Sequence, residues 1–170
     1  MKESLYIDKI ISSLRKKLDE DDFLYRNFCK GELIKSKVVF HSPLKECELD
    51  NLKKLNVPED YINFLRISNG AELFIDDYKG SLPLLKLYSL DKVIEWREFY
   101  KLNLQSENEI PIGLLADNCG LIIDERGFIN GKPYLALGDG SQRFEFSFQE
   151  WLDKFIICQG NEFWLFNNLY

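Results

Sequence analysis

The chain has 170 residues, of which 45% are hydrophobic and 29% charged, a composition typical of a folded globular domain and not of a disordered chain. Its 22 basic and 28 acidic residues give a formal net charge of −6, so it lacks the basic surplus that nucleic-acid binding requires. Residues 86–170 carry 13 acidic and 8 basic residues, against 15 and 14 in residues 1–85. We therefore expect no direct nucleic-acid ligand, and a basic partner that docks on the second half.

The cysteines and the apolar stretches narrow the class of protein further. The four cysteines are widely spaced without a CxxC pair, and His41 is the only histidine, so we expect no metal site, no redox pair and no cofactor. No stretch approaches the roughly 18 apolar residues that a membrane span needs. The sequence predicts a cytoplasmic protein with free thiols and no membrane contact.

Residues 1–30 are predicted to form a helical extension. Apolar residues at helical spacing place one stripe of this helix against the core: Ile7, Ile10, Ile11, Leu14 and Leu18. The acidic run at 19–22 would lie at the negative end of the helix dipole, so we expect the helix to end there. A strand is expected at 36–40 and a short helix around 49–55.

The segment VPEDYINFLRISNG, residues 57–70, is the most informative part of the chain. Pro58 suits the first position of a helix, and the two acidic residues after it complement the positive end of the helix dipole. Asn69 and Gly70 tolerate the left-handed backbone conformation that closes a helix. The sequence therefore predicts a helix that is fixed at both ends.

The rest of the chain alternates strands with two helices. Strands are expected at 71–75, 82–88, 110–116, 120–124, 133–137 and 143–147. Ser89 is a candidate cap for a helix that follows it, and residues 147–150 form a capping box for the last helix. Because short turns such as DERG and GDGS separate the strands, we predict an α+β fold whose sheet is antiparallel, partly mixed, and flanked by helices. The aromatic tail, residues 161–170, is expected to be an edge strand or a contact surface.

Catalytic patterns are not found. His41 is the sole candidate base for a nucleophile, and the hydrolase, nucleotide-binding and zinc-protease motifs are missing. Two carboxylate pairs could support glycosidase chemistry, namely Asp76 with Asp77 and Asp124 with Glu125, but both are expected in solvated turns that keep them ionised. We predict no catalytic residue. A small enzyme that acts on a sugar or peptide through these acids is an alternative.

The segment LNVPEDYINFLRISNGAEL resembles the signature of the SUKH superfamily, which includes the Smi/Knr cell-wall regulators. The matching positions, to which we assign structural roles, are Pro58, Tyr61, Phe64, Leu65, Asn69 and Gly70. Later segments follow the order of that family as well: LYSLDKVIEW, IPIG with ADNCGLIID, and SFQEWLDKFI. The resemblance covers roughly residues 45–158 and implies a single α+β domain, 1–170, that binds proteins.

Many bacterial members of the superfamily are immunity proteins of polymorphic toxin systems. The resemblance implies that this protein neutralises a cognate toxin by stoichiometric occlusion. It also implies a toxin of the nuclease type, because many toxins of these systems are nucleases with basic grooves, and the acid surplus suits such a basic partner. Carboxylates for charge complementarity and aromatic anchors give the candidate contact residues: Asp76, Asp77, Tyr78, Asp117, Asp124, Glu125 and Trp164. The alternative is a non-catalytic scaffold or regulatory module of the cell-wall-regulator type, which binds a host protein without blocking an active site.

Overall fold

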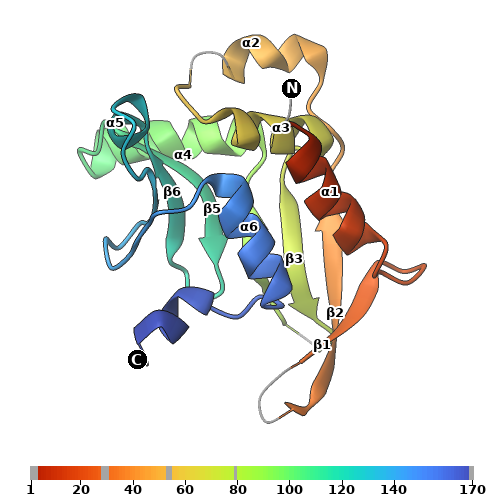
Figure 1. The fold of residues 1–170 in the computed structure, drawn as a ribbon. Helices are drawn as coiled ribbons and strands as arrows, with labels where there is room; N and C mark the ends of the chain where they lie inside the picture. Colours follow the sequence, from red (N-terminus) through yellow and green to blue (C-terminus); the bar gives the residue numbers. More distant parts are fainter. Residues whose placement is uncertain (1–3, 28–30, 53–54, 79, 169–170) are drawn as a thin grey trace.

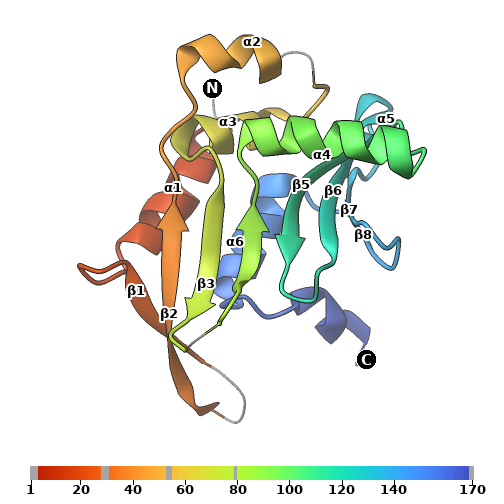
Figure 2. The same cartoon turned by 180° about the vertical axis from the view of Figure 1, so that it is seen from behind.

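One antiparallel sheet organises residues 4–27, 31–52, 55–78 and 80–168, the parts of the chain that a computed structural model describes (Figures 1 and 2). The strands are β1 (Phe23–Asn27), β2 (Leu33–Phe40), β3 (Ala71–Asp76), β4 (Pro83–Leu87), β5 (Glu109–Leu115), β6 (Gly120–Asp124), β7 (Leu135–Leu137) and β8 (Arg143–Phe144). The helices are α1 (Ser4–Arg15), α2 (Leu49–Leu52), α3 (Glu59–Ile67), α4 (Leu90–Asn103), α5 (Glu125–Ile129) and α6 (Phe148–Ile157), with the 3-10 helices η2 (Glu46–Glu48) and η3 (Phe163–Asn168). α1 and α6 lie on one face of the sheet (Figure 1), and α4 crosses the other (Figure 2).

The strands follow one another across the sheet in chain order, and each neighbouring pair is antiparallel. The predicted α+β class is confirmed, but the expected mixed component is wrong for the described strands. Even the long connection through α4 returns the chain antiparallel to β4, with Leu87 opposite Gly113. In such a meander the turns β1–β2, β3–β4, β5–β6 and β7–β8 all fall at one end of the sheet, which we call the hairpin end.

The helix of the informative segment packs into the centre of the core. Tyr61, Phe64 and Leu65 of α3 are fully buried, as their helical spacing predicts. The ring of Tyr61 lies edge-on to that of Phe148 in α6, with 5.1 Å between the ring centroids. Because burial removes the Tyr61 hydroxyl from solvent, its pKa is raised above the ordinary value.

Asn69 and Gly70 have structural roles that differ in part from the expectation. The Oδ1 atom of Asn69 accepts a hydrogen bond of 2.7 Å from the backbone N–H of Leu90, so Asn69 caps α4. Ser89 occupies the N-cap position, but its side chain makes no capping bond. Gly70 has a φ of +98°, and a Cβ there would lie 3.0 Å from the carbonyl oxygen of Leu87, so glycine is required.

The N-terminal residues are not a purely helical extension. α1 ends at Arg15, and β1 follows as the edge strand of the sheet. The acidic run forms a turn between them, in which the carboxylate of Asp19 accepts a bond of 2.8 Å from the backbone N–H of Phe23. This bond lowers the pKa of Asp19. In the described part of the chain, no helix has both the length and the apolar character required to cross a bilayer.

The C-terminal elements confirm the capping box and correct the tail. The side chain of Ser147 accepts from the backbone N–H of Glu150, whose carboxylate accepts from the N–H of Ser147 in return. Beyond α6, η3 buries Trp164 against Trp151, with 5.8 Å between the ring centroids. Phe163 and Trp164 are therefore part of the core and lie in a 3-10 helix, not in an edge strand.

Candidate protein-binding site

Three of the seven predicted contact residues lie in the interior. Asp76 is 6% exposed, Glu125 is 8% exposed and Trp164 is 6% exposed. The expectation that Asp76 and Glu125 occupy solvated turns is wrong, since Asp76 ends β3 and Glu125 begins α5. Trp164 contacts the ring of Phe144 at a centroid distance of 5.4 Å. These three side chains stabilise the fold and are closed to a partner.

Asp76 is held in a buried network at the hairpin end. The Nη2 atom of Arg26 donates to both carboxylate oxygens of Asp76, at 2.7 and 2.6 Å. The hydroxyl of Ser36 donates to the same carboxylate at 2.6 Å and accepts from the Nε of Arg26 at 2.9 Å. A buried charge needs such pairing to be tolerated. The carboxylate of Asp76 is therefore neutralised within the fold.

The second predicted carboxylate pair, Asp124 and Glu125, joins neighbouring segments of the fold through ion pairs and hydrogen bonds. The Nη2 atom of Arg97 in α4 lies 2.6 Å from Glu125, whose other oxygen accepts from Asn56 at 2.5 Å. Asp124 caps α5 through the backbone N–H of Gly127 at 3.0 Å, and it pairs with Arg143 of β8 at 2.8 Å. The DERG segment, expected as a turn, is the start of this capped helix.

The other three predicted residues are exposed. Asp77 and Tyr78 lie in the β3–β4 turn, and Tyr78 is 63% exposed. Asp117 lies in the β5–β6 turn, two strands further along the sheet. All three are at the hairpin end.

Two further acids, which the sequence did not single out, join Asp117. Asp139 lies in the β7–β8 turn and Glu162 in the segment between α6 and η3. Asp117 and Asp139 both line a shallow pocket of about 390 Å³ beside Tyr100 and Cys119. No lysine or arginine in the described ranges forms an ion pair with Asp117, Asp139 or Glu162. We call these three carboxylates the acidic rim.

The carboxylates of the acidic rim affect the pKa values of their neighbours, because no basic side chain among the described residues pairs with them. Partial burial raises the pKa of Glu162, and the charge of Asp117 raises it further. The pKa of the Cys119 thiol is raised by burial and by the charges of Asp139 and Asp117. Asp139 itself stays ionised, because the backbone N–H of Ser141 donates to it and lowers its pKa. The rim therefore brings acidic groups close together without a basic ion-pair partner among the described residues.

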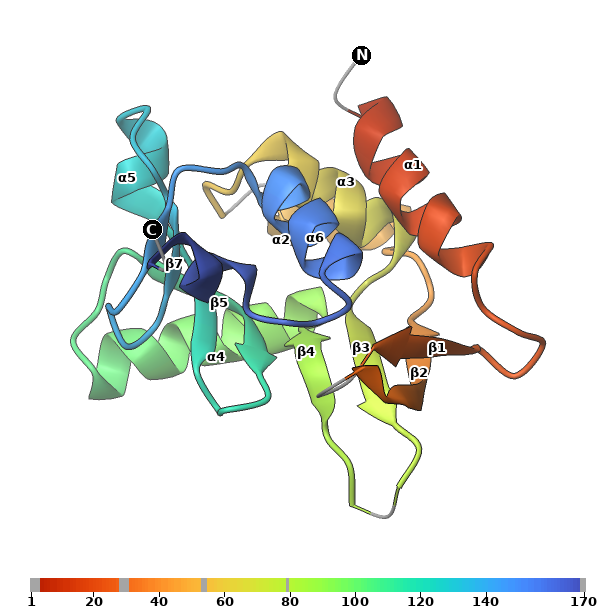
Figure 3. The same cartoon turned by 60° about the horizontal axis from the view of Figure 1, so that its bottom comes forward.

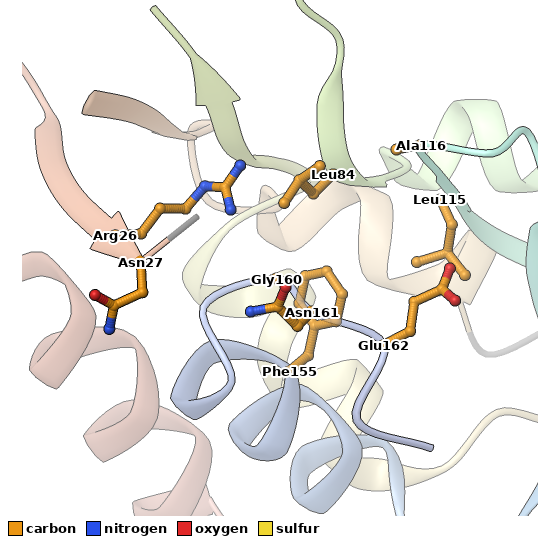
Figure 4. Close-up of a pocket in the computed structure, with 9 residues that line it drawn as sticks. All are labelled: Arg26, Asn27, Leu84, Leu115, Ala116, Phe155, Gly160, Asn161 and Glu162. Carbon is orange, nitrogen blue, oxygen red and sulfur yellow. The ribbon is translucent and has the colours of Figure 1, made fainter. Parts of the chain in front are cut away.

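A pocket of about 370 Å³ adjoins the acidic rim through Glu162. Figure 4 shows Leu84, Phe155 and Leu115 around its centre, so the middle of the pocket is apolar. Gly160, after α6, lets the backbone pass close to the apolar side chain of Leu84. A Cβ at Gly160 would approach Leu84 Cδ1 to 2.5 Å, and its φ is +84°.

The two ends of the pocket differ in charge. Arg26 and Asn27, from the end of β1, lie on one side, and Glu162 lies beside Leu115 on the other (Figure 4). The backbone N–H of Asn27 donates to the Gln159 side chain at 2.5 Å, which ties β1 to the segment after α6. Figure 3 turns the hairpin end toward the viewer, with the chain after α6 running across it.

In the described part of the chain, no group of three or more His, Cys, Asp or Glu residues could hold a metal ion.

Comparison with known proteins places this geometry in a family. Residues 45–164 match the SMI1 / KNR4 family (SUKH-1), a segment that includes α3, Asp117, Asp139 and Glu162 but not β1. The uncharacterized protein YobM of Bacillus subtilis (strain 168) is 29% identical to this chain over 170 residues, which cover 94% of this chain and 91% of that protein. Because the match extends over more than half of its residues, the chain belongs to the SMI1 / KNR4 family (SUKH-1).

Proposed function

We propose that the protein is an immunity protein, which binds a cognate bacterial polymorphic toxin and neutralises it by stoichiometric occlusion. Membership of the SMI1 / KNR4 family (SUKH-1) supports this class of function, which acts by binding and not by catalysis. The observation that carries the proposal is the acidic rim, whose carboxylates have no ion-pair partner within the described ranges. We also propose a cytoplasmic location, which the free thiols of Cys47, Cys119 and Cys158 support.

The rim suits a basic partner for a physical reason. Carboxylates that repel one another gain free energy when a cationic surface covers them, whereas an acid that is already paired gains little. A nuclease-type toxin has a basic groove that binds the phosphates of its substrate. A row of carboxylates can occupy such a groove, because carboxylates are negatively charged as phosphates are. The rim would also accelerate encounter with a basic toxin through long-range attraction.

Co-expression with the product of the neighbouring gene tests the proposal, which requires that product to be a toxin. We expect a 1:1 complex in size-exclusion chromatography and protection of growing cells from the toxin. The triple variant Asp117→Asn, Asp139→Asn and Glu162→Gln should lose protection while it keeps the fold. The matched control removes the same charge elsewhere on the surface, through Asp8→Asn, Glu20→Gln and Glu107→Gln, and should still protect.

Two outcomes would contradict the proposal. Failure of the wild-type protein to bind or protect would exclude an immunity role against that toxin. A stable complex in which the bound protein keeps its own activity would instead indicate the scaffold or regulatory alternative, because an immunity protein must block its partner.

A further inference from the structure

We propose that the pocket of Figure 4 receives one long basic side chain, an arginine or a lysine, from the toxin. This inference rests on the proposed function, because it names the part of the toxin that anchors the complex. The pocket and the acidic rim share Glu162, so one partner surface can engage both. Buried pockets that take a single anchor residue carry much of the binding energy in many protein interfaces.

The shape of the pocket fits the aliphatic part of such a side chain. Its volume of about 370 Å³ lies near the lower end of the roughly 300–1,000 Å³ typical of small-molecule sites. Leu84, Leu115 and Phe155 form its apolar middle. Arginine and lysine bury their methylene stems against apolar walls while the charged head reaches a polar group. A short acidic or amide side chain would leave this apolar middle uncovered.

The charge of the pocket selects a cation over an anion. Arg26 lies at one end, but its charge is already balanced by Asp76 at 2.6 Å. Glu162 at the other end has no basic partner in the described ranges, and Asp117 is close enough to act on it. The uncompensated charge of the pocket is therefore negative, and it is concentrated at one end.

Glu162 also gains more from a cation than a solvated carboxylate would. Partial burial disfavours its ionised form and raises its pKa. A guanidinium or ammonium group placed beside it would supply the pairing that the protein itself does not. This is the end of the pocket at which we place the charged head of the inserted side chain.

The pocket is held open before a partner arrives. The hydrogen bond from Asn27 to Gln159 fixes β1 against the segment after α6, and the backbone at Gly160 passes so close to Leu84 and Phe74 that a Cβ there would approach them to 2.5 and 2.9 Å. A preformed pocket lowers the ordering cost of binding. Arg26 and Asn27 lie outside the family match, which begins at residue 45, so the N-terminal segment completes a pocket that the matched residues form only in part.

A binding experiment with small probes tests the pocket without the toxin. Amide shifts in ¹⁵N–¹H spectra are followed during titration with N-acetyl-arginine methylamide, and with the uncharged N-acetyl-norleucine methylamide for comparison. We expect the arginine probe to shift Ala116, Asn161 and Glu162 selectively. Glu162→Gln should weaken this binding by about tenfold to a hundredfold, the value of a hydrogen bond to a charged group.

Two variants separate loss of binding from loss of fold. Ala116→Phe fills the mouth of the pocket without a change of charge and should abolish the shifts, while Glu20→Gln removes an exposed acid elsewhere and should leave them unchanged. Far-UV circular dichroism and urea unfolding check that each variant is folded. Equal binding of both probes, or shifts confined to Tyr100, Cys119 and Asp139, would overturn the inference.

The toxin complex then distinguishes the two proposals. If the toxin binds wild type but binds Glu162→Gln and Ala116→Phe equally well, the pocket is not the anchor site, whereas the immunity role stands. If the toxin does not bind wild type, the immunity role fails, and a toxin side chain is not the natural occupant whatever the probes show. A loss of at least about tenfold in affinity for both variants supports both proposals.

Discussion

The carboxylates of the interior and those of the acidic rim lie in opposite electrostatic environments. Asp76 pairs with Arg26 through three hydrogen bonds, and Glu125 pairs with Arg97 at 2.6 Å. The rim carboxylates have no such partner among the described residues, and the charge of Asp117 raises the pKa of Glu162. One residue type therefore stabilises the fold in one place and remains available to a partner in another.

The comparison shows that net charge alone does not locate a binding surface. The second half of the chain has the acid surplus, but two of its acids form ion pairs within the fold, Asp124 with Arg143 and Glu125 with Arg97. Only an acid without an internal partner can attract a basic protein at long range. Other acids of this half, such as Glu107, have no ion pair among the described residues either, but the rim carboxylates also lie close enough together for the charge of Asp117 to act on Glu162, and for those of Asp117 and Asp139 to act on Cys119.

Removal of an interior acid should have the largest effect. Asp76→Ala leaves the guanidinium of Arg26 buried without its partner, and we expect the free energy of unfolding to fall by about 3–5 kcal/mol. Urea unfolding followed by tryptophan fluorescence measures the change. The rim variant Asp117→Asn is the control, because its amide oxygen can still accept from the backbone N–H of Cys119, and we expect it to stay within about 0.5 kcal/mol of wild type.

A double substitution checks the cause of that effect. Arg26→Met combined with Asp76→Leu removes both charges, and we expect it to recover most of the stability that Asp76→Ala loses, since buried ion pairs are often replaceable by apolar residues. If the double variant were as unstable as Asp76→Ala, lost packing and not an unpaired charge would explain the result.

The second interior pair should matter less, because it is nearer the surface. The side chains of Arg97 and Glu125 are 13% and 10% exposed. Glu125→Gln keeps a bond to Asn56 but removes the ion pair, so we expect a loss of about 1–3 kcal/mol. Thermal unfolding provides the measurement. A loss larger than that of Asp76→Ala would reverse the order that burial predicts.

Local patterns predicted most of the fold. The apolar stripe of the first helix and the capping box at Ser147 are properties of neighbouring residues. The capping box is confirmed, and so is the stripe from Ile7 to Leu14, whereas Leu18 lies beyond the end of α1. β1 was missed because its five residues, FLYRN, include an arginine and an asparagine. These two polar residues interrupt the apolar pattern by which a strand is predicted. The start of α5 was read as a turn because five residues show no helical period.

The pairing of charges could not be predicted from such patterns. Asp76 lies 50 residues from Arg26, and Glu125 lies 28 residues from Arg97, so only the fold brings each pair together. The acidic rim is likewise assembled from two turns of the meander and the segment after α6. Its residues carry no common motif, and a turn such as GDGS gives no sign of its neighbours.

Loss of the acidic rim should slow binding more than it weakens the finished contact. In the triple variant Asp117→Asn, Asp139→Asn and Glu162→Gln, we expect the association rate with the toxin at low salt to fall by about tenfold or more, because long-range attraction is lost. Biolayer interferometry at low and high salt measures both rate constants. A reduction that is the same at high salt would show that the rim does not steer the toxin.

The smallest expected effect is on stability, and it should have opposite signs for two acids of the rim, Glu162 and Asp139. The pKa of Glu162 is raised from its ordinary value of 4.5, so the folded state holds this proton more tightly than the unfolded state, and wild type loses stability as pH rises through the window between the two values. Glu162→Gln should therefore be more stable than wild type at neutral pH, by only about 0.2–0.5 kcal/mol because water still reaches and screens this partly buried carboxylate. The difference should vanish in acid, where Glu162 is protonated in both states.

Asp139 should show the reverse. Its pKa is lowered by the N–H of Ser141, so its contribution is present above the unfolded-state pKa and is lost as pH falls through the folded-state pKa. Asp139→Asn should therefore be less stable than wild type at neutral pH and equal to it in acid. Urea midpoints at neutral and acid pH measure both signs. If Glu162→Gln were destabilising as well, Glu162 would have a stabilising partner in the folded protein, and the contrast between paired interior acids and an uncompensated rim would not hold at the residue that joins the rim to the pocket.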